Sequence, residues 1–191
     1  MNDDKTMFDA VVRPHLADAL ALARWITRNR ADAEDIMQEA CLRAFRSIHN
    51  CAGKNPRAWV LAIVRNTAFS WLEKNRRPDV VAIDDLDARE RVRLDRAGDW
   101  SGANAATPEA ELIAKADVAQ LRAAIESLPV EFREAIVLRD IHGLDYRQIA
   151  EVVSAPIGTV MSRLSRARRQ VMNALQRDEA PRTLSSCAVR S

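Results

Sequence analysis

Apolar residues recur at intervals of three and four positions in two long blocks of this chain. The repeat is clearest over residues 32–48, continues over 59–72, and returns over 157–175. This spacing places apolar side chains on one face of a helix, whereas a half-buried strand would alternate every second residue. No segment shows a strong strand pattern, and the sequence therefore predicts an all-α fold.

The segment 78–108 separates the two helical blocks and differs from both in composition. Apolar periodicity fades there, acidic residues are mixed with arginines, and glycine, serine and proline interrupt the chain. A segment of this kind buries too little apolar surface to fold alone. We therefore expect two small helical domains, 8–77 and 109–177, joined by a flexible acidic linker at 78–108 and followed by a loose tail at 178–191.

The sequence lacks the motifs by which most enzyme classes are recognised. The glycines form no phosphate-binding loop, and the three histidines are far apart in sequence. Cysteines are odd in number and form no CxxC pair, which favours reduced thiols over a disulfide framework or a zinc site. We expect no catalytic residue, metal or cofactor. The acidic start and the lack of a long apolar run predict a cytoplasmic protein without membrane insertion.

The most informative pattern is a helix-turn-helix near the end of the chain. Asp145 and Gln148 have capping-box spacing, a turn follows at 154–156, and a longer helix begins after it. The second helix of this motif normally enters the DNA major groove. Residues 154–177 contain several arginines and no acid, which favours DNA binding over the alternative, a solvated basic face on an ordinary hairpin.

Two further segments are candidates for binding. The helix expected to begin with Asn55 as its cap is basic and carries Trp59, Phe69 and Trp71. Aromatic side chains beside basic ones can hold unstacked single-strand bases, although tryptophans at helical spacing are also typical of a core. On the helix at 32–48, Leu42 lies on the charged side. That residue hints at a protein partner, and an ordinary solvent face is the alternative.

These segments, in this order, resemble the extracytoplasmic-function group of sigma-70 factors of bacterial RNA polymerase. The similarity rests on DAEDIMQEA followed by LRAFR at 32–46, on PRAWVLAIVRN at 56–66, and on GLDYRQIA with GTVMSRLSRAR at 143–168. The resemblance implies a factor that directs core polymerase to specific promoters and helps to open them, with no active site of its own. It implies as partners the polymerase clamp coiled coil and flap, duplex and single-stranded promoter DNA, and an anti-sigma factor.

The resemblance also implies roles for individual residues. Those expected to bind polymerase are Asp35, Gln38, Glu39, Leu42 and Arg43. Those expected at the −10 element are His49, Asn50, Lys54, Arg57, Asn66, Ser70 and Lys74. Those expected at the −35 element are Thr159, Ser162, Arg163, Ser165, Arg166 and Arg169. Met161 departs from the family, in which many relatives have a basic residue.

Two other functions fit parts of the sequence. An autonomous helix-turn-helix regulator would bind duplex DNA without polymerase, but the clamp-like helix disfavours it. A sigma mimic that only sequesters an inhibitor would need no DNA contact, but the basic helix at 56–74 disfavours it.

Overall fold

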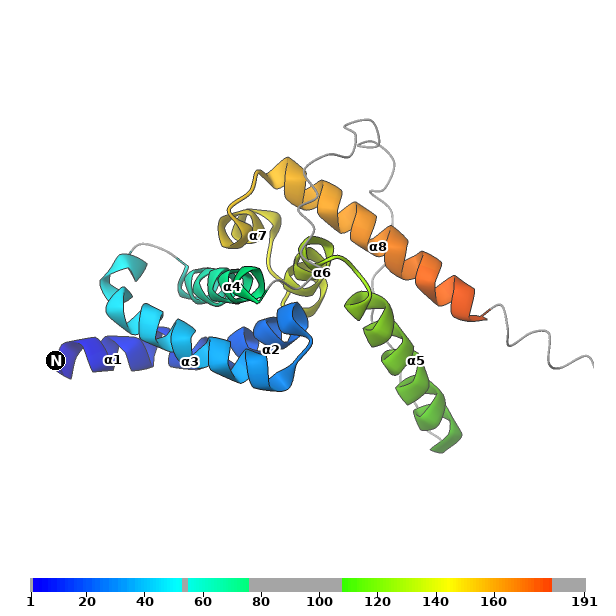
Figure 1. The fold of residues 1–191 in the computed structure, drawn as a ribbon, viewed down its shortest axis with the longest axis horizontal. Helices are drawn as coiled ribbons and strands as arrows, with labels where there is room; N and C mark the ends of the chain where they lie inside the picture. Colours follow the sequence, from blue (N-terminus) through cyan, green and yellow to red (C-terminus); the bar gives the residue numbers. More distant parts are fainter. Residues whose placement is uncertain (1, 53–54, 76–107, 180–191) are drawn as a thin grey trace, which may run out of the picture.

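The computed structural model describes residues 2–52, 55–75 and 108–179, with only the backbone described for residue 2, 108–116 and 178–179. All regular elements in these ranges are helices, so the predicted all-α class is confirmed (Figure 1). The first group comprises α1 (Asn2–Val11), η1 (Arg13–His15), α2 (Leu16–Thr27), α3 (Arg30–Arg46), η2 (Ile48–Cys51) and α4 (Pro56–Lys74). The second comprises α5 (Pro108–Glu126), α6 (Val130–Ile136), the π-helical turn η3 (Val137–Ile141), α7 (Tyr146–Val153) and α8 (Ile157–Glu179).

Asparagine caps fix where the two main helices of the first group begin. The Asn29 side chain accepts hydrogen bonds from the backbone N–H groups of Ala31 and Asp32 at the start of α3. Asn55 does the same at the start of α4, where Pro56 occupies the first helical position, as the sequence predicts. These contacts satisfy backbone donors that have no partner inside the helix.

The core of the first group lies between α2, α3 and α4. Its fully buried side chains include Leu22, Ile26, Ile36, Leu61 and Val64. Each such side chain contributes about 1.5–3 kcal/mol by leaving water. This burial holds α3 and α4 in fixed positions, so that the remaining faces of the two helices become stable surfaces.

The helix-turn-helix forms as the sequence predicts. Asp145 accepts a hydrogen bond from the Gln148 backbone, and the Gln148 side chain accepts one from the Asp145 backbone, which completes the capping box of α7. Ser154 then reverses the chain with a left-handed φ of 53°. In α8, Val160 and Leu164 are buried, as the apolar repeat over 157–175 predicts, but Ile157, at the first residue of the helix, is 42% exposed.

Element limits differ from the sequence estimates by several residues. Helix α1 begins before residue 8, and α8 continues past residue 177. The segment predicted as a linker lies outside the described residues, except for Pro108, which begins α5. Within the described ranges no helix is long and apolar enough to cross a membrane.

The two groups of helices pack against each other, which the sequence does not predict. Helix α4 lies against α7, and α2 lies against α6 and η3 (Figure 1). Helix α4 therefore takes part in two interfaces, one with its own group and one with the second group.

Candidate functional site

The first surface of interest is the outer side of α3. Asp35, Gln38, Glu39 and Leu42 are exposed, and Arg43 is half-buried beside them. Leu42 is 53% exposed among these charged and polar side chains. The structure thus brings together all five residues that the resemblance assigns to polymerase binding.

The charges on this surface are partly neutralised within the helix. Arg43 Nε donates to Glu39 Oε1 at 2.8 Å, and this hydrogen bond lowers the pKa of Glu39. A surface ion pair of this kind adds little stability, because solvent screens it. An exposed leucine beside a screened ion pair fits contact with another protein.

The second surface lies on α4. Asn66 and Lys74 are exposed and Ser70 is half-buried, at four-residue intervals that place all three on one face. Arg57 lies two and a half turns from Asn66, which puts it on the opposite side of the helix. There its Nε donates to Asp18 Oδ2 at 2.8 Å. The structure therefore separates Arg57 from the other −10 candidates on this helix.

The turn before α4 carries the remaining −10 candidates. His49 and Asn50 are exposed in η2, and His49 Nε2 lies 3.0 Å from Asp4 Oδ1 of α1. Lys54 lies outside the described residues.

The aromatic residues of α4 are part of the packing. Trp59, Phe69 and Trp71 are half-buried and contact the core. The Arg65 guanidinium lies 4.1 Å from the centre of the Phe69 ring, a cation–π contact. Each aromatic still keeps an accessible part.

The third surface is the outer side of α8. Thr159, Ser162, Arg163, Ser165 and Arg166 are half-buried, and Arg169 is exposed. Most of these residues lie away from the buried stripe of Val160, Leu164, Ala167 and Val171. Ser162 Oγ donates to the Thr159 carbonyl at 2.9 Å, which fixes its rotamer.

Arg163 and Arg168 of α8 lie close to carboxylates within the fold. Arg168 lies away from the candidate face, and its Nη2 is 2.7 Å from Asp140 Oδ1. This hydrogen bond raises the pKa of Arg168. Arg163 lies next to the buried stripe, and its Nη1 is 3.5 Å from Glu134 Oε1. Arg163, a member of the candidate −35 face, thus already lies close to a carboxylate within the fold.

The carboxylate of Glu134 is a feature that the sequence analysis missed. It lies in α6 with a fully buried side chain and also binds Arg65 of α4. Burial raises the pKa of Glu134, and the hydrogen bond and charge of Arg65 act in the opposite direction. The sequence gives no clear signal for this burial, because residues 130–138 mix Glu131, Arg133 and Glu134 with apolar residues.

A second polar contact crosses the interface near Arg57. Asp18 binds Arg57 and lies 3.7 Å from Nδ1 of the buried His142. Burial lowers the pKa of His142, so its imidazole is neutral at neutral pH. The contact with Asp18 is therefore not an ion pair at that pH.

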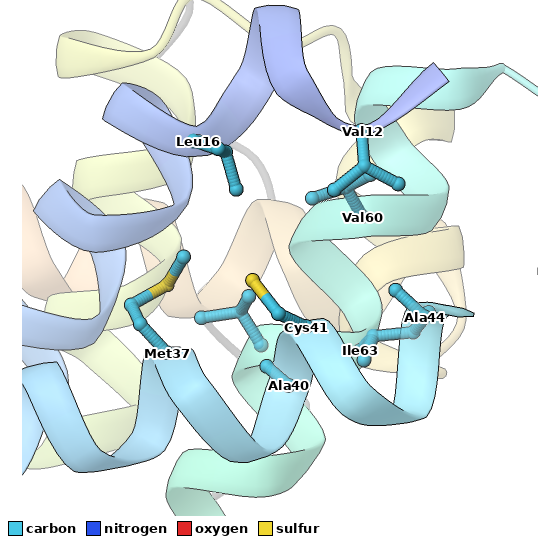
Figure 2. Close-up of a pocket in the computed structure, with 9 residues that line it drawn as sticks. Val12, Leu16, Met37, Ala40, Cys41, Ala44, Val60 and Ile63 are labelled. Carbon is cyan, nitrogen blue, oxygen red and sulfur yellow. The ribbon is translucent and has the colours of Figure 1, made fainter. Parts of the chain in front are cut away.

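The hollow shown in Figure 2 offers no polar ligand site. It lies among Val12 and the helices α2, α3 and α4, and only apolar side chains and the Cys41 thiol line it. Burial raises the pKa of Cys41, which keeps the thiol protonated. Among the described residues no cluster of three potential metal ligands occurs.

Comparison with known proteins identifies the family to which this chain belongs. Sigma-70 region 2 matches residues 11–78, and sigma-70 region 4 matches residues 119–171. An ECF RNA polymerase sigma-E factor of Haemophilus influenzae is 34% identical over 91% of this chain and 89% of its own length. The chain belongs to the extracytoplasmic-function sigma factors.

Other sigma factors show the same relationship. The ECF sigma factor SigE of Mycolicibacterium smegmatis is 33% identical over 88% of this chain, which spans 61% of that relative's length. Among solved structures, the sigma factor RpoE of Bartonella quintana, in complex with the anti-sigma factor NepR, is 25% identical. It covers 92% of this chain and 98% of its own, with a TM-score of 0.62. In the present chain, the region 4 match covers α7 and α8 up to residue 171.

Proposed function

We propose that this sigma factor directs core RNA polymerase to specific promoters and helps to open them. The observation that carries the proposal is the similarity to curated ECF sigma factors over 91% of the chain, including both sigma regions. In this role the residues of the chain perform no covalent chemistry, and they supply binding energy. The chain acts in the cytoplasm together with core polymerase.

The outer side of α3 is the proposed polymerase contact. Leu42 enters an apolar site on the clamp coiled coil, and Asp35, Gln38 and Glu39 surround it with polar contacts. Arg43 holds Glu39 in place. A buried apolar centre with a polar rim is the usual anatomy of a protein interface.

The face of α4 formed by Asn66, Ser70 and Lys74 is proposed to contact the upstream edge of the melted −10 region. His49, Asn50 and Lys54 of the preceding turn capture an unstacked base. Unstacking costs a few kcal/mol per base, and contacts with the separated strand offset that cost. Because Arg57 donates to Asp18, which also lies beside His142 of the second group of helices, we assign Arg57 no DNA contact in this arrangement of the two groups.

Helix α8 is proposed to read the −35 element. Ser162, Arg163, Ser165 and Arg166 contact bases or adjacent phosphates, and Thr159 and Arg169 extend this surface along the groove. An arginine that donates two hydrogen bonds to guanine discriminates against other bases by about 1–3 kcal/mol. Arg168 is excluded from this role, because it binds Asp140 away from that face.

Each region alone provides a small interface, and the polymerase supplies the link between them. Binding both on one enzyme raises the effective concentration of each region at its DNA element. The similarity to a sigma factor solved with its anti-sigma factor also supports control of this chain by an anti-sigma partner.

Run-off transcription with purified core polymerase tests the proposal. Sheared genomic DNA of the source bacterium serves as template, and RNA 5′ ends are mapped with and without the chain. We expect discrete start sites only when the chain is present. The double variant Asp35→Arg, Glu39→Arg should abolish them while circular dichroism stays unchanged, because both side chains are exposed.

The alternatives are distinguished by this assay together with a gel shift of promoter DNA in the absence of polymerase. An autonomous regulator would shift the duplex DNA without polymerase and would give no start sites in the run-off assay. A sigma mimic would give neither result.

A further inference from the structure

The first turns of α8 carry two exposed apolar side chains to which no role has been assigned above. Ile157 is 42% exposed and Met161 is 48% exposed. They are four residues apart, so the two side chains are neighbours on the surface of the helix. Apart from its own helix, nothing in the described residues lies within 4 Å of the place that a side chain on Gly158 would occupy. The chain therefore leaves this end of α8 uncovered.

The apolar pair continues the face that is proposed to read the −35 element. Along α8, four residues follow one another at four-residue intervals, which places them in one row on the helix surface: Ile157, Met161, Ser165 and Arg169. Ser165 and Arg169 are members of the proposed −35 face. In a helix-turn-helix, the N-terminal residues of the second helix contact base edges. The apolar pair therefore occupies the end of the row that this motif places against the bases.

The charge around the pair indicates what kind of partner covers it. Residues 154–177 contain five arginines and no acidic residue. A surface of this kind attracts the phosphates on the two sides of a DNA groove, whereas a protein partner would need acids to match it. Within the major groove, the apolar feature of the base edges is the 5-methyl group of thymine. An apolar side chain at this place on α8 therefore fits a thymine better than any other base.

We propose that Met161, with Ile157 beside it, selects thymine at the −35 element by packing against its 5-methyl group. This inference rests on the proposed sigma function, because it names a base contact of the same face of α8. The unbranched thioether of methionine adapts its shape to an irregular apolar surface, which suits a methyl group on a base edge. Ile157 excludes water from one side of the contact. The arginines of the face supply phosphate contacts and guanine contacts, and the apolar pair supplies selectivity for thymine.

The test removes the methyl group from the DNA. A promoter mapped in the run-off assay is prepared as a series of duplexes in which each −35 thymine, on either strand, is replaced in turn by deoxyuridine. Uracil pairs with adenine as thymine does and differs from it only by the missing 5-methyl group. Holoenzyme with the wild-type chain should bind at least one of these duplexes about fourfold more weakly, as expected for the loss of one buried methyl group.

Variants of the chain assign this methyl effect to one side chain. Met161→Ala should bind the thymine duplex about fourfold more weakly than wild type, and exchange of that thymine for uracil should then change its affinity by less than about twofold. Met161→Leu retains an apolar side chain of similar volume and should keep the preference for thymine. Because Met161 is exposed, circular dichroism should show the same helix content in both variants.

Met172 provides a matched control on the same helix. It is 49% exposed and lies about 16 Å further along α8, beyond the turns that are proposed to contact bases. Met172→Ala should therefore keep the wild-type ratio of affinities for the thymine and uracil duplexes.

A charged substitution gives a second readout of the same contact. Met161→Lys should lose the preference for thymine and should bind DNA with a salt dependence that is steeper by about one unit, because a lysine at this place neutralises one more phosphate.

Two results would overturn the thymine contact. One is equal binding of all the deoxyuridine duplexes by wild-type holoenzyme, and the other is a preference for thymine that persists in Met161→Ala. In both cases transcription from the mapped promoter would leave the proposed function intact. A wild-type chain that starts no transcription with core polymerase would instead refute the proposed function, and the thymine contact with it.

Discussion

Helices α4 and α8 both carry a proposed DNA-binding face, but they are held in the fold in different ways. The buried residues of α4 cover about half of its circumference, because α2, α3 and α7 all pack on it. The buried residues of α8 form the narrow stripe of Val160, Leu164, Ala167 and Val171. When a helix is buried along one narrow stripe, the apolar pattern of its sequence predicts which face is exposed. When a helix packs in two interfaces, the pattern does not predict the exposed face.

The largest expected effect tests whether α4 packs in both groups of helices. Leu61→Ala should cost about 2–5 kcal/mol of unfolding free energy, because it removes a fully buried side chain. Hydrogen–deuterium exchange should then show lost protection in α2 and α3 and also in α7. Leu164→Ala is the counterpart in α8, and its effect should stay within α5–α8. Unchanged protection of α7 in Leu61→Ala would show that α4 belongs to the first group alone.

The next effect concerns the outer side of α8. Arg166→Ala should weaken holoenzyme binding to promoter DNA by about 5- to 150-fold, the range for one arginine–guanine contact. Arg168→Ala is the matched control on the opposite side of the helix, where Asp140 holds the side chain. We expect it to change affinity less than twofold. Equal losses in both variants would mean that α8 contributes only general positive charge.

This contrast also explains what the sequence could and could not predict. The capping box at Asp145, the cap at Asn55 and the stripe at Val160 and Leu164 depend on neighbours within a few residues, and all of them formed as predicted. The Glu134 contacts could not be predicted, because Arg65 is distant in sequence and a residue pattern does not show which helices meet. The opposite orientations of Arg57 and Asn66 follow from helix geometry, but the family resemblance had grouped them.

A smaller effect concerns the −10 face of α4. Asn66→Ala should change stability little, because its side chain is exposed. It should reduce promoter opening about fivefold, as expected for the loss of roughly one hydrogen bond. Permanganate reactivity of −10 thymines measures opening on duplex DNA, and a pre-melted template should restore activity. An equal defect on both templates would argue against a role in opening.

The smallest effect is a pH dependence of the folding stability, which arises from the buried His142. Because burial lowers the pKa of His142, the folded chain disfavours the protonated imidazole. The stability that the neutral group provides is present above pH 6.5 and is lost as the pH falls below that value. His142→Gln should flatten the dependence of the melting temperature on pH between about 5 and 7. A variant with the same slope as wild type would place the titration elsewhere.

The most direct test places α4 and α8 on promoter DNA in the holoenzyme. A chain without its native cysteines receives one cysteine at Ser70 or at Gln170, each labelled with an iron chelate that cleaves nearby DNA. The account predicts cleavage near the −10 element from position 70 and near the −35 element from position 170, about 25 base pairs or 85 Å apart. Cleavage by both labels at one DNA position, or from position 170 alone, would contradict the account.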